Sequence, residues 1–534
     1  MNMKNFFKSW LNNPITDKKL KEFQKNNINK IFDISKDFHR AAQIAYPQTR
    51  DIDNDTLILE SGHQPNFFPF SGTFKKVFLL HYIYKNLKKM NRNSICIFGF
   101  ADQNVATASY LYKNHLPSYN RDGCVGVGFP MKGHEWSRFD TITKPPPDRW
   151  ETEMEKLEKY YFYYASQIRE NPQLIRERIQ HILDISWNCY NKADKFSDLN
   201  AYIFANLCEE IFNDGIFFFR YSDLQKNEVF INEFKSIFIN IPIYNQLFNE
   251  AIKNYSLDLP FVEKDQVPFW YHCECGSNIT LFVKDASVEG QCKSCMEKIS
   301  FPLKDFEQMR EHIYRKISLN AVSRNVIFSE GLGTHLFISG SGGSLAYGKI
   351  SRDIGIKLGY HIPVTIASIS RDYYLGLIQK YAIKMLMHSF DLTTDDLCSK
   401  DLNFKIVEKW NELQREIRKK EKMDTVKWKR LRSRAQNIQL DLKIIKKSMC
   451  RPYSIIDILI CVDIEDLAQF WQAALQDPII DENDEIMKLV WDVAYQLGEG
   501  VHVKPCNLSE IFSKICSLGL DYATKDIDTE SAHR

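Results

Sequence analysis

The stretch that decides the fold is "LESGHQPNFFPFSGTFKKVF", from Leu59 to Phe78. It joins the end of the apolar run "DTLILESG" to a segment with helical spacing, through a loop that carries a histidine and two amides. A short apolar run that ends at glycine predicts a buried strand. Ser71 is placed to cap a helix over about 72–86, with Lys75 and Lys76 off its buried face. The polar loop therefore follows a strand directly, where open α/β sheets bind ligands.

The same pattern occurs again twice after this stretch. "SICIFGF" (94–100) predicts a second buried strand, and Asp102 follows it closely. Much later, "THLFISGSGGS" predicts a strand that enters a glycine-rich turn, "SLAYGKISRDIGIKLG" (344–359) a helix, and "IPVTIAS" (362–368) another strand. The rhythm of strand, loop, helix and strand is that of a parallel sheet. We therefore expect an α/β fold in which the two units are halves of one sheet, with a long insertion between them.

The insertion carries the most specific local motif, "HCECGSNITLFVKDASVEGQCKSCMEK". Two pairs of cysteines, each on a turn with a nearby glycine, can close a tetrahedral zinc site. Four thiolates fill such a site, so the zinc is expected to be structural. The alternative is a set of free surface cysteines, and His272 is a substitute ligand. The predicted metal ligands are Cys273, Cys275, Cys292 and Cys295.

Two loops are candidate ligand sites. In "GHQPN", His63 can bind phosphate or transfer a proton near neutral pH, and the amides can orient a substrate. In "SGSGGSLAY", small residues before a helix N-terminus favour an anion such as phosphate. A structural histidine, a turn-forming Asp102 and an ordinary glycine turn are the alternatives. The candidate binding residues are Gly62, Gln64, Asn66, Ser339, Gly340, Gly342, Gly343 and Ser344.

The segment 396–450 is helical and highly charged. Two apolar series with spacings of three and four predict a coiled-coil hairpin of two helices, which break near Asp424 or Thr425. Between Arg415 and Arg434, ten Lys or Arg stand against three Asp or Glu. Phosphate contacts with RNA are one explanation of this basic tip, and a solvated helix surface is the other. The hairpin is also the expected surface of a homodimer. The series are Ile406, Trp410, Leu413 and Ile417, and then Leu431, Ala435, Ile438, Leu442, Ile445 and Met449.

Composition places limits on the class of protein. The chain has 534 residues and a net charge of +2, so overall charge predicts neither a nucleic-acid nor a membrane binder. No run reaches the roughly 20 apolar residues of a membrane-spanning helix. The opening "MNMKNFFKSWLNN" lacks the apolar core of a signal peptide, and most of the 13 cysteines stand singly in apolar segments. We therefore expect a cytoplasmic protein without a membrane partner.

Together, these motifs resemble the cysteine-adding enzyme of bacillithiol biosynthesis. The opening "GHQP…F…G…FKKV" is similar to the "GQQ" segment of that family, and "ICIFGFADQNVAT" to its strand that ends in "EDHDF". "SGSGGSLAYGKISRDIGIKLGYHIPVTIASISR" resembles its "GGPGEIAY" helix with the following "PV…R" strand. The resemblance covers about 300 residues in the same order, followed by a coiled coil.

The resemblance implies a Rossmann-like core related to nucleotide-handling ligases, with ATP or ADP as the nucleotide. The family joins cysteine to an amino sugar attached to malate, so the implied activity is carbon–nitrogen ligation. His63, Asp102 and Arg371 are the implied catalytic residues. His63 stands in place of a glutamine, and Ser344 in place of a glutamate. The matching positions are Gln64, Asp102, Gly340, Gly343, Tyr347 and Arg371.

Three further functions remain open from the sequence. One is a non-catalytic scaffold, which is favoured because Ala101, Gln103 and Asn104 stand where the family has acidic residues and a histidine. "GHQPNFFPFSGTFKK" also resembles the start of the WbqC-like family of sugar and polysaccharide metabolism, although only over the first β-α unit. A zinc ribbon with a basic hairpin is also typical of RNA-binding or RNA-modifying proteins. The expected organisation is a first core half with helical insertion (1–260), a zinc ribbon (261–305), a second core half (306–395), a coiled-coil hairpin (396–450) and a helical region with a polar tail (451–534).

Overall fold

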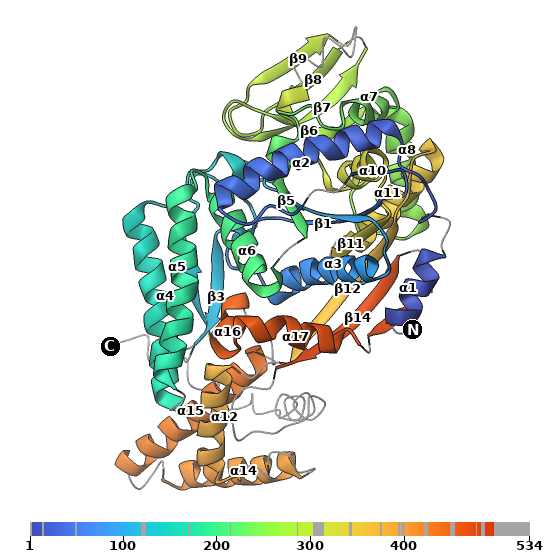
Figure 1. The fold of residues 1–534 in the computed structure, drawn as a ribbon. Helices are drawn as coiled ribbons and strands as arrows, with labels where there is room; N and C mark the ends of the chain where they lie inside the picture. The colour runs from blue at the N-terminus through green and yellow to red at the C-terminus, as the bar shows by residue number, and fades with distance from the viewer. Residues whose placement is uncertain are drawn as a thin grey trace.

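The structure is a computed structural model of the chain, and its elements are drawn in Figure 1. It describes residues 3–12, 15–48, 51–118, 124–168, 171–213, 215–285, 287–302, 314–340, 344–373, 376–393, 396, 401–420, 425–448, 454–476, 478–481 and 486–495.

The core is a seven-stranded sheet in which only one edge strand is antiparallel. Its order is β13-β14-β12-β11-β1-β2-β5. In chain order, the six parallel strands follow the arrangement 3-2-1-4-5-6 of the doubly wound α/β sheet. Their bounds are β1 (Leu57–His63), β2 (Ser94–Phe100), β5 (Ile216–Arg220), β11 (Leu336–Gly340), β12 (Val364–Tyr373) and β14 (Met487–Ala494), and β13 is Ile479–Asp481.

The two units predicted from the sequence therefore meet in one sheet. β1 pairs in parallel with β11, with Leu59 opposite Leu336, and on its other side with β2. The strand order reverses between β1 and β11. In open α/β sheets this reversal opens a crevice at the carboxyl ends of the two strands. The carboxyl ends of β1, at His63, and of β11, at Gly340, are therefore neighbours.

Helices cover both faces of the sheet, which explains its apolar strands. Alternate residues of β1 pack on opposite sides: Leu57 and Leu59 belong to one core cluster and Ile58 to the other. One face carries α3 (Ser71–Lys89), α6 (Phe196–Phe212) and α17 (Ile464–Ala474), and the other α2 (Glu22–Ala42), α10 (Ala321–Leu332) and α11 (Ser344–Leu358). Further helices surround them: α1 (Met3–Leu11), α4 (Pro147–Ile168), α5 (Pro172–Lys192), α7 (Ile231–Ile239), α8 (Ile241–Asn254) and α16 (Ile455–Cys461).

The expected helix after the opening loop is present but differs in two respects. It begins at Ser71, and the residue at its N-cap position is Phe70, so the predicted cap at Ser71 is wrong. Lys75 and Lys76, which were expected off the buried face, are 0% and 6% exposed. The reason is that α3 contacts the sheet on one side and α6 and α17 on another, which leaves little of its surface open.

The insertion forms a second sheet with the order β10-β6-β7-β8-β9, antiparallel throughout. It lies at one end of the molecule (Figure 1). One strand, β10, comes from beyond the expected ribbon boundary at residue 305 and pairs with β6. The strands are β6 (Gln266–His272), β7 (Asn278–Lys284), β8 (Ser287–Gln291), β9 (Lys298–Pro302) and β10 (Ile317–Leu319), and a separate hairpin joins β3 (Lys113–Pro117) to β4 (Cys124–Gly128).

The expectation that 451–534 is a helical region is wrong in its described part. After α16 and α17 come two strands, and β14 pairs in parallel with β12 as part of the main sheet. The run "MKLVWDVA" is short and is interrupted by Lys488 and Asp492, so its periodicity is weak. Its burial becomes evident only in the fold, where Leu489, Trp491 and Val493 are each at most 1% exposed. The expected polar tail lies outside the described residues.

Two helices occupy the predicted hairpin, α14 (Leu402–Lys420) and α15 (Thr425–Ser448). The break falls where it was predicted. A coiled coil is not what buries their apolar series, because α15 packs mainly on α12 (Leu377–Phe390), with α14 contacting both (Figure 1). Ile406 and Ile438 are buried in the main core cluster. The side chains of Leu442, Ile445 and Met449 lie outside the described residues.

Among the described helices, none combines the length and the hydropathy that crossing a bilayer requires.

Candidate functional site

Basic side chains from three elements converge near the reversal point of the sheet and form a basic cluster. His63 ends β1, Lys76 comes from α3, and Arg324 from the first turn of α10. The Lys76 ammonium donates to the Gly62 carbonyl oxygen at 3.0 Å, and His63 Nδ1 lies 2.9 Å from the Gln64 carbonyl oxygen. Within the described part of the chain, no ion pair is recorded for Lys76 or Arg324. Among the described residues, positive charge is thus gathered there without a recorded ion pair, and Glu60 is the acidic group close to Arg324.

The basic groups alter one another's pKa. Burial, together with the charges of Lys76 and Arg324, lowers the pKa of His63 to about 3, so the ring is neutral at pH 7. Burial and Arg324 lower the pKa of Lys76 to about 7. Burial raises the pKa of the neighbouring Glu60 to about 7, although the Thr334 hydroxyl and Arg324 oppose that rise. Burial is the largest cause of all three pKa shifts. The neighbouring positive charges add to the shifts of His63 and Lys76.

Lys76 and Arg324 were missed by the sequence reasoning. The second lysine of "FKKV" is a weak signal, since a lysine on a helix is usually solvated. Arg324 gives no signal, because it stands about 260 residues from His63 in the chain and only the fold brings it there.

Tyr221 explains why two glycines stand on neighbouring strands. An ideal Cβ on Gly62 would lie 2.5 Å from the Tyr221 hydroxyl oxygen, and one on Gly99 only 2.0 Å from the ring. The ring therefore lies across both strands, and Arg324 is positioned 5.8 Å from its centroid. Gly62 was expected to bind ligand. The structure gives it a packing role beneath Tyr221.

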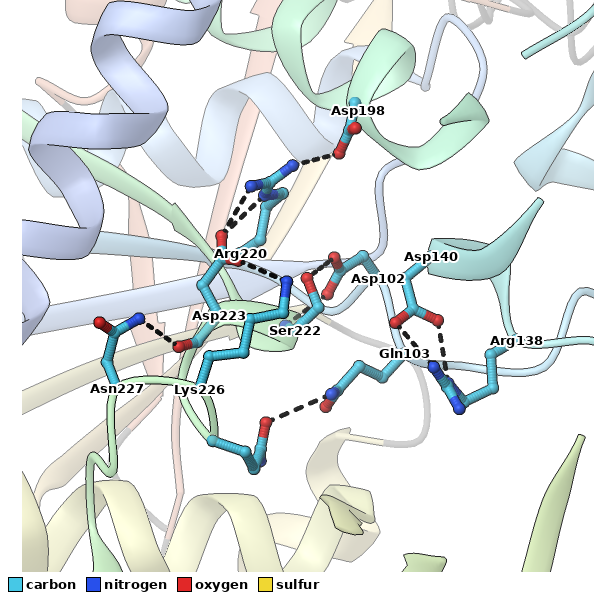
Figure 2. A network of polar contacts seen from close by, with 11 residues as sticks. Asp102, Gln103, Arg138, Asp140, Asp198, Arg220, Ser222, Asp223, Lys226 and Asn227 are labelled. Carbon is cyan, nitrogen blue, oxygen red and sulfur yellow. Dashed lines mark hydrogen bonds and ion pairs between the residues drawn. The ribbon is translucent and has the colours of Figure 1, made fainter. Parts of the chain in front are cut away.

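Asp102 is part of a polar network that ties the ends of β2 and β5 together (Figure 2). Its two carboxylate oxygens accept from Ser222, from the backbone N–H at 3.0 Å and from the hydroxyl at 2.5 Å. Its carbonyl accepts from the Asp140 N–H at 2.9 Å, and Asp140 pairs with Arg138. The carboxylate is 1% exposed, and burial, with the charge of Asp140, raises its pKa. Asp102 thus anchors two loops, and it lies itself in the turn that follows β2, as the alternative interpretation expected.

The rest of this network is built on Arg220, the last residue of β5. Its guanidinium pairs with Asp198 of α6 and with Asp223, which lies 2.8 Å away. Gln103 donates to Gln225 at 3.3 Å. These contacts hold the loop that follows β2 in a defined place at the strand ends (Figure 2).

The glycine-rich turn is described only at its borders. Ser339 is buried, and an added Cβ on Gly340 would meet nothing within 4 Å, so the space beside this glycine is open. α11 begins at Ser344, and Tyr347 packs against the core cluster on that face. Gly342, Gly343 and the side chain of Ser344 lie outside the described residues.

Of the other predicted residues, Gln64 lines a cavity together with Asn104 and Trp136, whereas Asn66 and Arg371 are not among the lining residues of that cavity. Asn66 is 8% exposed in the loop before α3. Arg371 is exposed near the end of β12. β12 lies three strand spacings from β2, about 14 Å, so Arg371 and Asp102 cannot hold one small group between them.

Beside Arg371, Asp372 forms a buried ion pair that was not predicted. Its carboxylate accepts from the Lys75 ammonium at 2.7 Å, from the Tyr495 hydroxyl at 2.9 Å and from the Ser71 hydroxyl. The Lys75 ammonium also lies 5.5 Å from the Trp491 ring centroid. This pair joins α3 to β12 and β14, and it is structural in character because every partner is a core element.

The four predicted cysteines come together. All four Sγ atoms lie within 4.8 Å of one another, with Cys273 and Cys295 at 3.4 Å and Cys275 and Cys292 at 3.6 Å. Four thiolates at the Zn–S length of about 2.3 Å would stand about 3.8 Å apart in a tetrahedron. The cluster therefore has the size and the donor set that suit a zinc ion.

The local backbone explains how the cysteines converge. The first pair lies in the turn between β6 and β7, where the Gly276 N–H donates to the Cys273 carbonyl at 3.0 Å and Gly276 has φ +88°. The second pair lies between β8 and β9, where the Met296 N–H donates to the Cys292 carbonyl at 2.9 Å. His272, the substitute ligand, is outside the cluster. Its Nε2 is buried without a hydrogen-bond partner among the described atoms.

Neither the protein-family models nor the curated protein sequences compared with this chain include a match.

Proposed function

We propose that this protein is an enzyme that binds an anionic substrate at the carboxyl ends of β1 and β11. In this proposal it joins a carboxyl group to an amine, in the manner of the cysteine-adding enzyme of bacillithiol biosynthesis. The observation that carries the proposal is the convergence of His63, Lys76 and Arg324 at the reversal point of the sheet. The reaction class comes from the sequence resemblance alone.

The physical argument for an anion is one of charge balance. Burying Lys76 next to Arg324 is costly unless a negative group offsets both charges. A bound phosphate or carboxylate would do so, and it would raise the pKa of Lys76 and His63 towards their ordinary values. α11 begins four residues after β11 ends, so its N-terminal N–H groups lie at the same edge of the sheet. ATP or ADP is a ligand of suitable charge.

The proposed chemistry forms one carbon–nitrogen bond. The amine attacks a carboxyl carbon activated with ATP, the activated oxygen leaves, and the amine loses one proton. Neutral His63 is a suitable proton acceptor once an anion has raised its pKa, and Lys76 and Arg324 would stabilise the oxyanion. Asp102 is engaged with Ser222, so we assign it to positioning the loop after β2, not to the amine.

The reaction itself is tested with purified protein, an amino sugar attached to malate, labelled cysteine and ATP. A labelled amide product that depends on ATP supports the ligase. If no product forms and cysteine does not bind, the ligase is discarded, while the anion site is judged separately by the experiment that follows.

Replacing Lys76 by methionine is expected to abolish anion binding without unfolding the protein. Methionine has nearly the volume of the lysine stem, and it removes a buried charge. Calorimetric titration with ATP and with sulfate should show at least a roughly tenfold loss of affinity, as a charge-assisted contact is worth about 1.5–3 kcal/mol. The control is Lys89→Met, at the exposed end of the same helix. Equal affinity in the two variants would contradict the proposed site.

Anion affinity is also expected to fall as pH rises from 6 to 8. Lys76, with a pKa of about 7, loses its charge across this range, and Glu60, with a similar pKa, gains one near Arg324. Both changes weaken anion binding, while His63 stays neutral throughout. Sulfate is the suitable probe because it does not titrate there, and the expected loss is about tenfold by pH 8. Lys76→Met should retain only the part of this pH dependence that is due to Glu60. If sulfate affinity in Lys76→Met falls with pH as steeply as in the unaltered protein, Lys76 is not the titrating cation.

A further inference from the structure

The inserted sheet has two faces of different character. On one face, Phe269, Leu281 and Val288 are buried in a core cluster with α7, α8 and α10. Phe269 lies 4.8 Å from the Phe234 ring of α7, between centroids. Since successive strand residues point to opposite faces, the alternate residues form the other face of the sheet.

That other face is one wall of a large cavity. The core supplies further lining residues, namely Gln64 of the loop after β1, Asn104 of the loop after β2 and Trp136 of the loop after β4. The cavity has a volume of about 1200 Å³, above the roughly 300–1000 Å³ of most small-molecule sites. It therefore suits a ligand longer than one small metabolite, or one end of a polymer.

Aromatic rings from the sheet and from the core line the cavity. Trp270 of β6 and Phe282 of β7 lie on adjacent strands of the same face, and both line the cavity. Neither is fully buried. Trp136, from the loop after β4, is 61% exposed, which is costly for a tryptophan without a partner. Flat rings on neighbouring strands are the arrangement on which unpaired bases stack.

The charges on the cavity wall are mostly positive. Three lysines, Lys284, Lys293 and Lys298, stand against one carboxylate, Glu289, among the described residues that line it. Lys284 pairs with Glu289 at 3.5 Å. Lys293 and Lys298 are exposed, and no ion pair is recorded for either within the described part of the chain. A neutral sugar would use the rings and amides, but it would not use these ammonium groups.

We propose that this cavity binds the end of a single-stranded nucleic acid, with its bases on Trp270, Phe282 and Trp136 and its phosphates on Lys293 and Lys298. Amide side chains such as Asn278 and Gln291 are placed to contact base edges. The nucleic-acid strand would reach Gln64, which follows His63 of the basic cluster in the chain. The inference is independent of the proposed ligase reaction, since it rests on other residues. It also differs from binding at the basic hairpin tip, on α14 and α15.

The test is fluorescence anisotropy with labelled oligouridine and oligodeoxythymidine of about eight nucleotides, at low and moderate salt. RNA and DNA share the chemistry, and the two probes distinguish them. Phe282→Ala and the double variant Lys293→Glu/Lys298→Glu are each expected to weaken binding about tenfold or more. The charge variant should also flatten the salt dependence. Metal content and circular dichroism establish that each variant is folded.

Two matched controls keep the test specific. Lys264→Glu/Lys357→Glu reverses two exposed lysines outside the cavity, and Lys419→Glu/Arg430→Glu reverses two at the hairpin. Both should bind as the unaltered protein does. The proposal is overturned if neither oligonucleotide binds, if the cavity variants bind normally, or if only the hairpin variant loses binding. Binding of a neutral oligosaccharide that is lost in Phe282→Ala, with no oligonucleotide binding, would assign the cavity to sugars.

Discussion

Replacement of Cys292 by serine is expected to release the metal and unfold the inserted sheet between β6 and β9. Cys292 is fully buried, and its Sγ lies 3.6 Å from that of Cys275. Structural zinc contributes about 10–16 kcal/mol in small zinc domains, more than the strands of this sheet can replace by their own contacts. A hydroxyl in place of one thiolate removes most of that contribution.

The measurement is metal content after dialysis, combined with hydrogen exchange. The unaltered protein should retain one zinc per chain, and Cys292→Ser much less than that. Amides of β7, β8 and β9 should then exchange quickly, while those of β1 and β2 stay protected, because the main sheet has its own core. Cys124→Ser, on β4, is the matched control. Full zinc retention in Cys292→Ser would show that the cluster does not hold the metal.

Replacement of Asp372 by asparagine is expected to destabilise the core by about 3–5 kcal/mol. The Lys75 ammonium is 0% exposed, and the Asp372 carboxylate is its recorded ion-pair partner, at 2.7 Å. Asparagine preserves the shape but leaves the buried ammonium with only the weaker interaction with Asp492 to offset its charge. For a typical domain, with 5–15 kcal/mol of total stability, such a loss is large.

The midpoint of urea unfolding is the measurement, and a second variant separates the causes. Asp372→Asn combined with Lys75→Met should recover much of the loss, because it removes the unpaired charge as well. Asp258→Asn, at an exposed carboxylate, should change stability by less than about 0.5 kcal/mol. If the double variant is no more stable than Asp372→Asn, the buried charge is not the cause.

Much of the sheet could be predicted because its signals are local. Short apolar runs predicted β1, β2, β11 and β12, and the polar loops after β1 and β2 follow the carboxyl ends of these strands. β14 was missed, since its short apolar run is interrupted by two charged residues and its partner strand lies more than a hundred residues earlier. The coiled coil was predicted from spacing alone. Spacing shows that a helix has an apolar face but not which helix will cover it.

The sequence by itself determined the four-cysteine cluster and the two β-α-β units. In both, the deciding residues lie close together in the chain, so spacing and turn chemistry suffice. Only the tertiary structure decided the roles of Lys75 and Lys76, the second and third residues after Thr73 in the opening stretch. The ion-pair partner of Lys75 stands 297 residues away in the chain. The charge that lowers the pKa of Lys76 is that of Arg324, on another helix. A charged side chain is stable in the interior only when segments distant in the chain place compensating groups around it. The fold decides which segments those are.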